Sequence, residues 1–443
     1  MAISKVKGTY DITGLEAQKW VKLENLFRSV CRLYNYQEVR TPIMEYQELF
    51  HRSVGDTSDM VSKETYDFMD RGDRMVTLRP EGTAGMARSY IENKTYANGL
   101  VTKQFYIGPM FRYERPQKGR YRQFSQFGCE AYGSGDPALD AEVICLAKTI
   151  IEALGLNGVK VRINTLGDNE SRDNYRKALV DYFTPVKEEL CYDCQTRLLK
   201  NPLRILDCKV DKDSIHFKNA PIMRDYLNEA SKDHFNKVLK YLEEMGIEYE
   251  IDDHLVRGLD YYTHTIFEIE ADIPEFGAQN VLGGGGRYDN LIESLGGPET
   301  KAVGFAFGME RLLLAIEAEN RRISVEDFVH LFIIALGEEA KEVATGLLSK
   351  LRQGGLICDM DYQGRNLKSQ FKVADRYNSK YIAILGEEEI KNNVINIKNK
   401  ETGIQETIPL DEIYQYIVND LNKGHNCHCG SGCGSNCGGC KEE

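Results

Sequence analysis

The chain has 443 residues, of which 42% are hydrophobic and 28% are charged, and its formal net charge is -12. This length predicts two or three domains, and the composition excludes a disordered protein. No apolar run approaches the roughly 20 residues that span a bilayer, and the first residues lack the apolar stretch of a signal peptide, so we expect a cytoplasmic protein that does not enter a membrane. The negative charge also argues against a protein that coats nucleic acid indiscriminately, although it allows local basic patches.

Near the start, the spacing of Thr13 and Glu16 is that of a capping box at the beginning of a helix. The apolar residues that follow recur at alternating steps of three and four, namely Trp20, Leu23, Phe27, Val30 and Tyr34. This spacing predicts an amphipathic helix over residues 15–34. The segment YQEVRTP then predicts a short strand that ends at Pro42.

Later segments differ in pattern. Residues 168–250 carry many lysines and glutamates at helical spacing and predict a mainly helical insertion. The segment HTIFEIE predicts a strand, and KAVGFAFGMERLLLAIE predicts a strand that runs directly into a helix. From about residue 329, strand and helix patterns alternate, which indicates a separate domain with a small parallel sheet.

Residues 101–133 contain two segments with the period-two pattern and the aromatic and β-branched residues of strands, joined by PQKG. We expect them to form an antiparallel hairpin. Alternate side chains of a strand share a face, so Arg112 and Glu114 would point one way while Phe111 and Tyr113 pack on the other.

On the return strand, Gln126 and Glu130 share a face with Gly128, and the glycine would leave room for a ligand against the backbone. Arginine is abundant here, and its planar charged donors suit phosphate oxygens, so the hairpin predicts a nucleotide polyphosphate site. Arg311 falls in the first turn of a predicted helix, where a cation is unfavourable unless an anion or a carboxylate lies nearby. The alternative is a solvated hairpin whose arginines pair with neighbouring glutamates.

The segment FRYERPQKGRYRQFSQFGCE resembles the second signature motif of class II aminoacyl-tRNA synthetases, GFAFGMERLLL resembles the third, and the helix, strand and Pro42 near the start resemble the first. LVRGLDYYT and LRPEGTAG are similar to motifs of histidyl-tRNA synthetases. This resemblance covers the chain to about residue 421.

The resemblance implies an α/β protein with three parts. Residues 1–325 would form an α+β catalytic domain with a mixed, mostly antiparallel sheet, into which the helical segment 168–250 is inserted. Residues 326–421 would form a small α/β anticodon-binding domain. The Cys- and Gly-rich residues 422–443 lie outside the family pattern, and their composition, which cannot build an apolar core, predicts a flexible tail. A homodimer is implied as well.

The implied activity is the ligation of L-histidine to tRNA(His) in two steps. Histidine and ATP give histidyl-adenylate and pyrophosphate, and the histidyl group then passes to the 3′ end of the tRNA. The attacking carboxylate is already ionised at neutral pH, so the first step needs no strong base. It needs cations, from arginines and Mg²⁺, that neutralise charge on the α-phosphate and the leaving pyrophosphate.

By the same resemblance, Arg257 and Arg112 would be catalytic: Arg257 would contact the substrate carboxylate and the α-phosphate, and Arg112 would contact the α-phosphate. Arg120 and Arg311 would join Arg112 in binding ATP. The remaining histidine-binding candidates would line a pocket for the ammonium and the imidazole, namely Glu81, Thr83, Gln126, Glu130, Tyr261 and Tyr262.

The run GGGGRY would either approach the adenylate closely or form a tight turn. In the third domain, Lys368, Lys372 and Arg376 recur at four-residue steps and predict either a phosphate-binding stripe or a solvated helix face.

Two metal questions follow from the twelve cysteines, seven of which lie before residue 359. Without an export signal, we expect these seven to be reduced thiols. Cys191, Cys194 and Cys208 supply three possible Zn²⁺ ligands, one short of a closed site unless His216 or an aspartate joins them. The tail offers further soft ligands without a predictable geometry, namely Cys427, Cys429, Cys433, Cys437 and Cys440.

The principal functional alternative is a catalytically inactive paralogue of the same fold, the histidine-sensing regulatory subunit of ATP phosphoribosyltransferase. That subunit lacks the anticodon-binding domain, whereas this chain has a complete third domain and retains Arg112, Arg257 and Arg311. A module that only binds RNA is a further alternative, and it would not need the polar face predicted on the hairpin.

Overall fold

The computed structural model describes residues 3–55, 60–271, 273, 280–319, 321, 323, 325 and 328–424. The chain divides into two compact units, Met1–Ser324 and Val325–Glu443. Among the described helices, none combines the length and the apolar character needed to cross a membrane.

The N-terminal unit is built on an eight-stranded sheet in the order β1-β5-β6-β11-β10-β9-β7-β8. The pairings β1/β5 and β7/β8 are parallel and the others are antiparallel. The strands are β1 (Gln37–Glu38), β5 (Thr102–Phe111), β6 (Gln123–Tyr132), β7 (Val159–Thr165), β8 (Glu250–Ile251), β9 (Thr263–Ala271), β10 (Val281–Arg287) and β11 (Ala302–Gly308). The predicted fold class, with its mixed and mostly antiparallel sheet, is confirmed.

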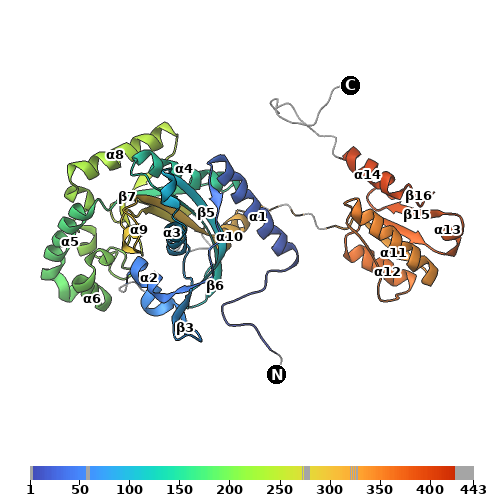
Figure 1. Cartoon of the computed structure of the whole chain (residues 1–443), viewed down its shortest axis with the longest axis horizontal. Helices are drawn as coiled ribbons and strands as arrows, with labels where there is room; N and C mark the ends of the chain where they lie inside the picture. Colours follow the sequence, from blue (N-terminus) through green and yellow to red (C-terminus); the bar gives the residue numbers. More distant parts are fainter. Residues whose placement is uncertain are drawn as a thin grey trace. The chain divides into compact units, whose positions relative to one another are not determined.

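One face of this sheet is covered by helices. They are α1 (Gly14–Leu33), α4 (Pro137–Ala153), α8 (Glu229–Glu244) and α10 (Met309–Ala318), as Figure 1 shows for the blue to orange part of the chain. The fully buried side chains of Phe27, Ile144 and Val238 share one core with Phe127 and Cys129 of β6. Because alternate residues of β6 point to opposite faces, Gln126 and Glu130 face away from the helices.

The predicted first helix is confirmed, and its apolar residues from Trp20 to Val30 are buried. The predicted capping box is wrong, because the Thr13 side chain accepts no hydrogen bond from the first turn. A second link between helices and sheet is ionic: the fully buried guanidinium of Arg287 on β10 donates to the carboxylate of Asp140 on α4 and to Asp289 at 3.1 Å.

Between β7 and β8 the chain consists of helices and turns, and Figure 1 shows helices α5 and α6 at one side of the unit. The helices preceding α8 are α5 (Asn169–Phe183), η3 (Thr184–Glu189), α6 (Tyr192–Lys200), η4 (Pro202–Ile205), α7 (Ile215–Lys218) and η5 (Met223–Tyr226). They enclose a small core of their own, which includes Leu179, Cys194 and Ile205.

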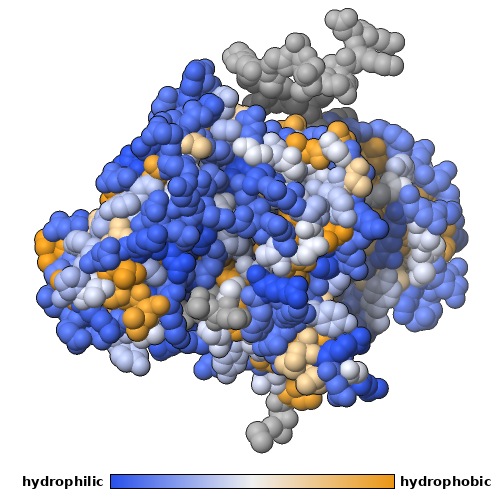
Figure 2. Space-filling view, turned by 60° about the vertical axis from the view of Figure 1, so that its left-hand side comes forward, coloured by the Kyte–Doolittle hydropathy of each residue, from blue (hydrophilic) through white to orange (hydrophobic). Residues whose placement is uncertain are grey.

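A three-stranded antiparallel sheet, ordered β2-β4-β3, adjoins the first helices after β1. The strands of this sheet are β2 (Met44–Tyr46), β3 (Tyr66–Met69) and β4 (Met75–Leu78). The helices in this part of the chain are α2 (Gln47–Val54), η1 (Met60–Glu64), α3 (Thr83–Glu92) and η2 (Thr95–Asn98). A later helix, α9 (Leu291–Ser294), contacts α2 and α3. Figure 2 shows a mainly hydrophilic surface with scattered hydrophobic groups. Several apolar side chains of the small sheet are exposed, namely Met44, Tyr46, Phe68, Met69 and Met75.

The C-terminal unit has a five-stranded sheet in the order β13-β12-β14-β15-β16. Its elements are β12 (Leu331–Ala335), α11 (Glu338–Gln353), β13 (Cys358–Met360), α12 (Leu367–Arg376), β14 (Tyr381–Leu385), α13 (Glu387–Lys391), β15 (Val394–Asn399), β16 (Gln405–Pro409) and α14 (Ile413–Gly424). The first three strands pair in parallel, as the alternation of strand and helix predicts. The prediction of a purely parallel sheet is wrong, because β15 and β16 add antiparallel pairings.

Candidate active site

A pocket lies on the face of the large sheet opposite to α1 and α4. All the site residues predicted from the sequence line this one pocket: Glu81, Thr83, Arg112, Arg120, Gln126, Glu130, Arg257, Tyr261, Tyr262 and Arg311. They come from the N-terminus of α3, from β6, from the loop between β5 and β6, from the segment before β9 and from α10. The fold therefore brings together side chains that are far apart in the sequence.

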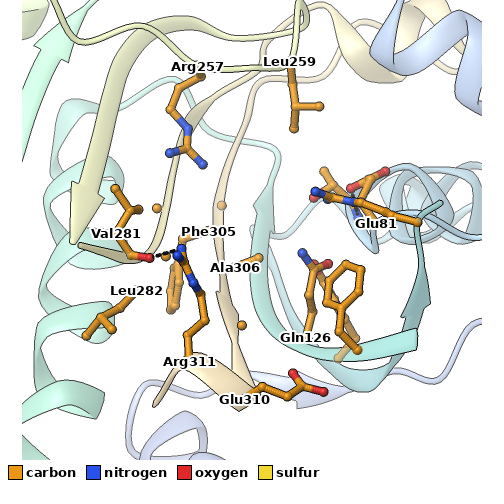
Figure 3. Close-up of a pocket in the computed structure, with 18 of the residues that line it drawn as sticks. Glu81, Gln126, Arg257, Leu259, Val281, Leu282, Phe305, Ala306, Glu310 and Arg311 are labelled. Atoms are coloured by element: carbon orange, nitrogen blue, oxygen red, sulfur yellow. Dashed lines mark hydrogen bonds between the residues drawn. The ribbon is translucent and has the colours of Figure 1, made fainter. Parts of the chain in front are cut away.

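The pocket has two chemically different sides. Figure 3 shows Arg257 and Arg311 on the side of Val281 and Leu282, whereas Glu81 and Gln126 lie on the opposite side. A ligand that spans the pocket would therefore meet Arg257 and Arg311 at one end and Glu81 and Gln126 at the other, with Arg112 close to Glu81.

On the acceptor side, Glu81 lies at the beginning of α3, where its carboxylate accepts the backbone N–H groups of Thr83 at 2.6 Å and Ala84 at 2.8 Å. A carboxylate is favourable at this helix end because the N–H groups there have no intrahelical acceptor. The Thr83 hydroxyl donates to Glu130 at 2.7 Å, and the Tyr288 hydroxyl donates to the other oxygen of Glu130. These contacts fix two buried carboxyl groups against the pocket.

Burial controls the charge of these two groups. It raises the pKa of Glu130 to about 8, although the hydrogen bonds from Tyr288 and Thr83 oppose this effect. Burial also raises the pKa of Glu81, against the hydrogen bonds from Ala84 and Thr83. Because a cation nearby favours the ionised form of a carboxyl group, a bound ammonium would release a proton from Glu130.

Tyrosine rings form much of the pocket wall. The ring of Tyr106 lies so close to Gly82 and Gly128 that a Cβ atom on either glycine would come within 2.2 and 2.4 Å of it. The prediction that Gly128 leaves room for a ligand is therefore wrong, since Tyr106 fills that space. The rings of Tyr261 and Tyr262 lie next to each other, with centroids 4.7 Å apart.

On the cationic side, the Arg257 guanidinium pairs with Glu268 of β9 and lies 5.9 Å from the centre of the Tyr262 ring. Arg311 donates to the carbonyl oxygen of Val281 (Figure 3). Arg257 is thus held by a carboxylate outside the pocket lining, whereas Arg311 is held by the backbone of a lining residue (Figure 3).

The hairpin is confirmed, but β5 ends at Phe111, so Arg112 and Glu114 lie in the loop rather than on a strand. Both nevertheless line the pocket, and Arg112 donates to the carbonyl oxygen of Pro80 at 2.9 Å. Glu114 lies 3.8 Å from Arg112 and 3.4 Å from Arg120. The prediction that Tyr113 packs beneath the hairpin is wrong, since it is 54% exposed, with the Arg122 guanidinium over its ring.

The glycine run belongs to β10 and is not a tight turn. A Cβ atom on Gly284 would lie 3.0 Å from the Arg257 guanidinium, and one on Gly304 of β11 would lie 1.9 Å from the Glu130 carboxylate. The glycines therefore make space for the functional side chains of the pocket.

Sequence reasoning missed several pocket residues. Tyr106, Glu114, Tyr288 and Glu310 also line the pocket, and both oxygens of Glu310 accept the Ser125 N–H, at 2.9 and 3.1 Å. Burial raises the pKa of Glu310 to about 7. Two of them stand next to predicted motif residues: Tyr288 ends the glycine run and Glu310 precedes Arg311. Their positions in the sequence do not reveal that Tyr288 contacts Glu130 or that Glu310 contacts Ser125.

The possible metal ligands lie elsewhere. Cys191, Cys194 and Cys208 come together in the insertion with Asp211, whereas His216 contacts Glu189 instead, with 2.8 Å between the ring nitrogen and the carboxylate oxygen. The five tail cysteines lie outside the described residues.

The raised pKa of Glu130 predicts a pH-dependent stability. Its folded-state pKa of about 8 exceeds the ordinary value of 4.5, so the folded chain holds the proton more tightly. The stabilisation from this group is complete below about pH 4.5 and is lost as the pH rises through about 8. Glu130→Gln removes this titration, so the free energy of unfolding of the original chain should fall relative to the variant across this window.

Urea titrations at several pH values, without ligands, measure this difference. Trp20 is the one tryptophan of the sequence and is buried in α1, so its fluorescence reports on the N-terminal unit alone. Parallel pH profiles for the two proteins would contradict the assigned ionisation.

Comparisons with known proteins agree with this geometry. The histidyl-tRNA synthetase family model matches residues 8–312, and an anticodon binding domain model matches residues 330–420. The chain is 54% identical over 419 residues to the histidine--tRNA ligase of Bacillus subtilis, with 94% of this chain and 99% of that protein covered. It is also 54% identical to the histidine--tRNA ligase of Acholeplasma laidlawii, with 92% and 97% covered.

Solved structures give the same result. The apo histidyl-tRNA synthetase of S. aureus aligns with a TM-score of 0.81 at 44% identity, covering 94% of this chain and all of that one. A Bacillus halodurans protein described as an ATP phosphoribosyltransferase regulatory subunit/histidyl-tRNA synthetase aligns with a TM-score of 0.61 at 21% identity, covering 87% and 98%, and this likeness concerns the fold alone. From its sequence matches over nearly the whole length and from the residues that its pocket brings together, the chain belongs to the histidyl-tRNA synthetase family.

Proposed function

We propose that the chain activates L-histidine with ATP and transfers the histidyl group to tRNA(His). The observation that carries this proposal is the division of one pocket into a side with guanidinium groups and a side with buried carboxyl and amide groups (Figure 3). A triphosphate requires the first and an amino acid with an ammonium and an imidazole requires the second. The family membership and the 54% identity to a named ligase support the same reaction.

Adenylation places a carboxylate next to the α-phosphate, so the two reactants repel each other unless cations lie between them. Arg257 is the residue for this task, because it lies deep in the pocket and its partner Glu268 fixes its orientation from outside. Arg112 would bind the α-phosphate from the loop after β5, while Arg120 and Arg311 would bind the remaining phosphates. Guanidinium groups held in this way stabilise charge on the leaving pyrophosphate with little reorganisation.

On the opposite side, the ionised form of Glu130 would accept the histidine ammonium, with Thr83 and Tyr288 holding its oxygens in place. Glu81, Gln126, Tyr261 and Tyr262 would bind the rest of the amino acid. A site that pairs both imidazole nitrogens rejects amino acids that lack either of them, because its buried polar groups would then stay unpaired.

ATP is consistent with the family, and Mg²⁺ is the metal expected with it. Mg²⁺ prefers oxygen ligands and is usually held by substrate phosphates and one or two carboxylates. Glu114 next to Arg112 and Arg120, and Glu268 next to Arg257, are the carboxylates that fit this role. When bound, the ion would neutralise charge on the phosphates. The candidate Zn²⁺ ligands of the insertion do not line this pocket.

The activity test is histidine-dependent exchange of labelled pyrophosphate into ATP. We expect exchange with histidine and none with other amino acids. Well-folded protein that is silent in this assay would contradict the proposal and favour a histidine-sensing regulatory subunit, which no observation here favours.

Arg257→Ala should lower exchange by about a hundredfold or more, which corresponds to about 3 kcal/mol of transition-state stabilisation. Arg257→Lys keeps the charge but not the planar pair of donors and should recover only part of the rate. Arg162→Ala is the matched control, because Arg162 pairs with Asp252 and Glu270 and does not line the pocket. Normal turnover by Arg257→Ala would show that its role is assigned wrongly.

The C-terminal unit would bind the anticodon of the tRNA. Lys368, Lys372 and Arg376 are exposed along α12 and fit contacts with phosphates. Replacing all three with alanine should weaken tRNA binding, reduce its salt dependence and slow aminoacylation, while pyrophosphate exchange stays unchanged. The control replaces three other exposed cations of this unit, Lys350, Lys391 and Lys398, and equal effects of the two triple variants would contradict a specific stripe.

A homodimer is the assembly that best fits the exposed apolar side chains of the small β2-β4-β3 sheet. Sedimentation equilibrium should give twice the chain mass of 50.4 kDa. A monomer at micromolar concentration would contradict this assembly, and charged substitutions of Phe68 and Met69 should dissociate the dimer if this sheet forms the interface.

A further inference from the structure

Four potential metal ligands converge in the insertion, outside the active-site pocket. One ligand atom from each of Cys191, Cys194, Cys208 and Asp211 lies within 4.8 Å of all the others. The sequence pattern supplied three of them, and the structure adds the carboxylate. The set is therefore complete for a four-coordinate ion.

The distances fit a tetrahedral Zn²⁺ site. With Zn–S bonds of about 2.3 Å, two sulfur ligands of a tetrahedron lie about 3.8 Å apart. The sulfur atoms of Cys191 and Cys208 are 3.7 Å apart, and the Cys208 sulfur is 3.7 Å from Asp211 Oδ2. Thiolate ligands favour Zn²⁺ over Mg²⁺ or Ca²⁺.

The backbone around the ligands is arranged to hold them. Cys191 immediately precedes α6, and Cys194 lies in its first turn, so one helix end carries two ligands. The Asp211 N–H points to the Cys208 sulfur at 3.4 Å, and the Cys191 N–H donates to the Asp211 carboxylate at 3.1 Å. Hydrogen bonds of this kind orient metal ligands.

The cluster is buried and lacks a compensating cation from the protein. Cys194 is fully buried, and Cys208 and Asp211 are 5% and 8% exposed. Within the described part of the chain, Asp211 forms no ion pair with a lysine, arginine or histidine. Hydrogen bonds from the Cys191 N–H and the Cys208 thiol offset part of the cost of burying this carboxylate, and a bound Zn²⁺ would supply a full counter-charge.

The segments that carry the cluster are short and pack around a small core. Helices η3, α6, η4 and α7 have between 4 and 9 residues each. Short segments around a small core commonly depend on a metal or on disulfides, and the cysteines here are free thiols.

The segment between the ligands contacts the loop that carries Arg257. Asn201 donates to the Asp260 carboxylate at 3.0 Å, and Arg204 donates to the carbonyl oxygen of Gly258 and lies 3.6 Å from Asp260. Both residues lie between Cys194 and Cys208. An ion that fixes the two ends of this segment would therefore also fix residues 258–260, directly after Arg257.

We propose that Cys191, Cys194, Cys208 and Asp211 bind one structural Zn²⁺ ion, which holds residues 191–211 against the loop at 258–260. The metal site itself does not depend on the proposed activity.

The test uses the full chain with serine in place of the five tail cysteines, because the tail could bind metal by itself: Cys427, Cys429, Cys433, Cys437 and Cys440. Elemental analysis of this protein should find one zinc per chain. Cys194→Ser and Cys208→Ser should abolish it, and Asp211→Asn should weaken zinc retention against a competing chelator at least about tenfold. Cys145→Ser is the control, since its sulfur lies in α4 near the Tyr34 hydroxyl and belongs to no such cluster.

Two further measurements remain decisive if a cysteine variant fails to fold. Chelation of the metal in the tail-substituted protein should increase amide hydrogen exchange at residues 191–211 and 258–260 and leave α12 unchanged. Addition of Co²⁺ to the chelated protein should give the absorption of tetrahedral cobalt with thiolate ligands. The proposal is overturned by absence of zinc and of Co²⁺ uptake under reducing conditions, by zinc that persists in Cys194→Ser and Cys208→Ser, or by a native disulfide between Cys191 and Cys208.

Discussion

The active site depends on how one arginine is held. Arg257 lies between the carboxylate of Glu268, the ring of Tyr262 and the glycine backbone of β10, and the loop after it is fixed by several donors. Arg172 on α5 donates to the carbonyl oxygens of Asp260 and Tyr262, both at 3.0 Å. A guanidinium that bridges two anionic reactants must already be in position when they arrive, because reorganisation would consume the stabilisation that it provides. In the proposed reaction, the insertion would thus support Arg257 from behind, without lining the pocket.

The two ends of the pocket carry groups of opposite charge. At one end, the guanidinium groups of Arg257 and Arg311 are held by the Glu268 carboxylate and the Val281 carbonyl oxygen, and in the proposed reaction they would bind the triphosphate. At the other, Glu81 and Glu130 are buried near each other, and burial raises the pKa of both. Burial favours the protonated form of Glu130, which limits the uncompensated charge inside the pocket. In the proposed complex, binding of the histidine ammonium and release of this proton would be linked.

The sequence predicts the parts of this site that depend on local pattern. The hairpin, the strand that runs into α10 and the positions of Arg112, Arg257 and Arg311 follow from periodicity and from motifs whose residues are contiguous. What it does not predict are pairings between distant segments: Glu268 with Arg257, and Tyr288 with Glu130. For the three cysteines it left the fourth ligand open between His216 and an aspartate, and the structure brings Asp211 to them. Each of these contacts joins segments whose separation is set by strand order and packing. The prediction that Gly128 leaves room for a ligand failed for the same reason. The ring that fills this space belongs to Tyr106 of the neighbouring strand β5, and the sequence of β6 alone does not reveal it.

The ring of Tyr106 packs directly against Gly82 and Gly128. The ring occupies the volume that side chains at positions 82 and 128 would need, so the three residues share one fixed amount of space. A methyl group added at either glycine would displace this ring, which lines the pocket, whereas shortening Tyr106 would open a void beside the glycines. A redesign that alters the volume of this part of the pocket must therefore change these three positions together.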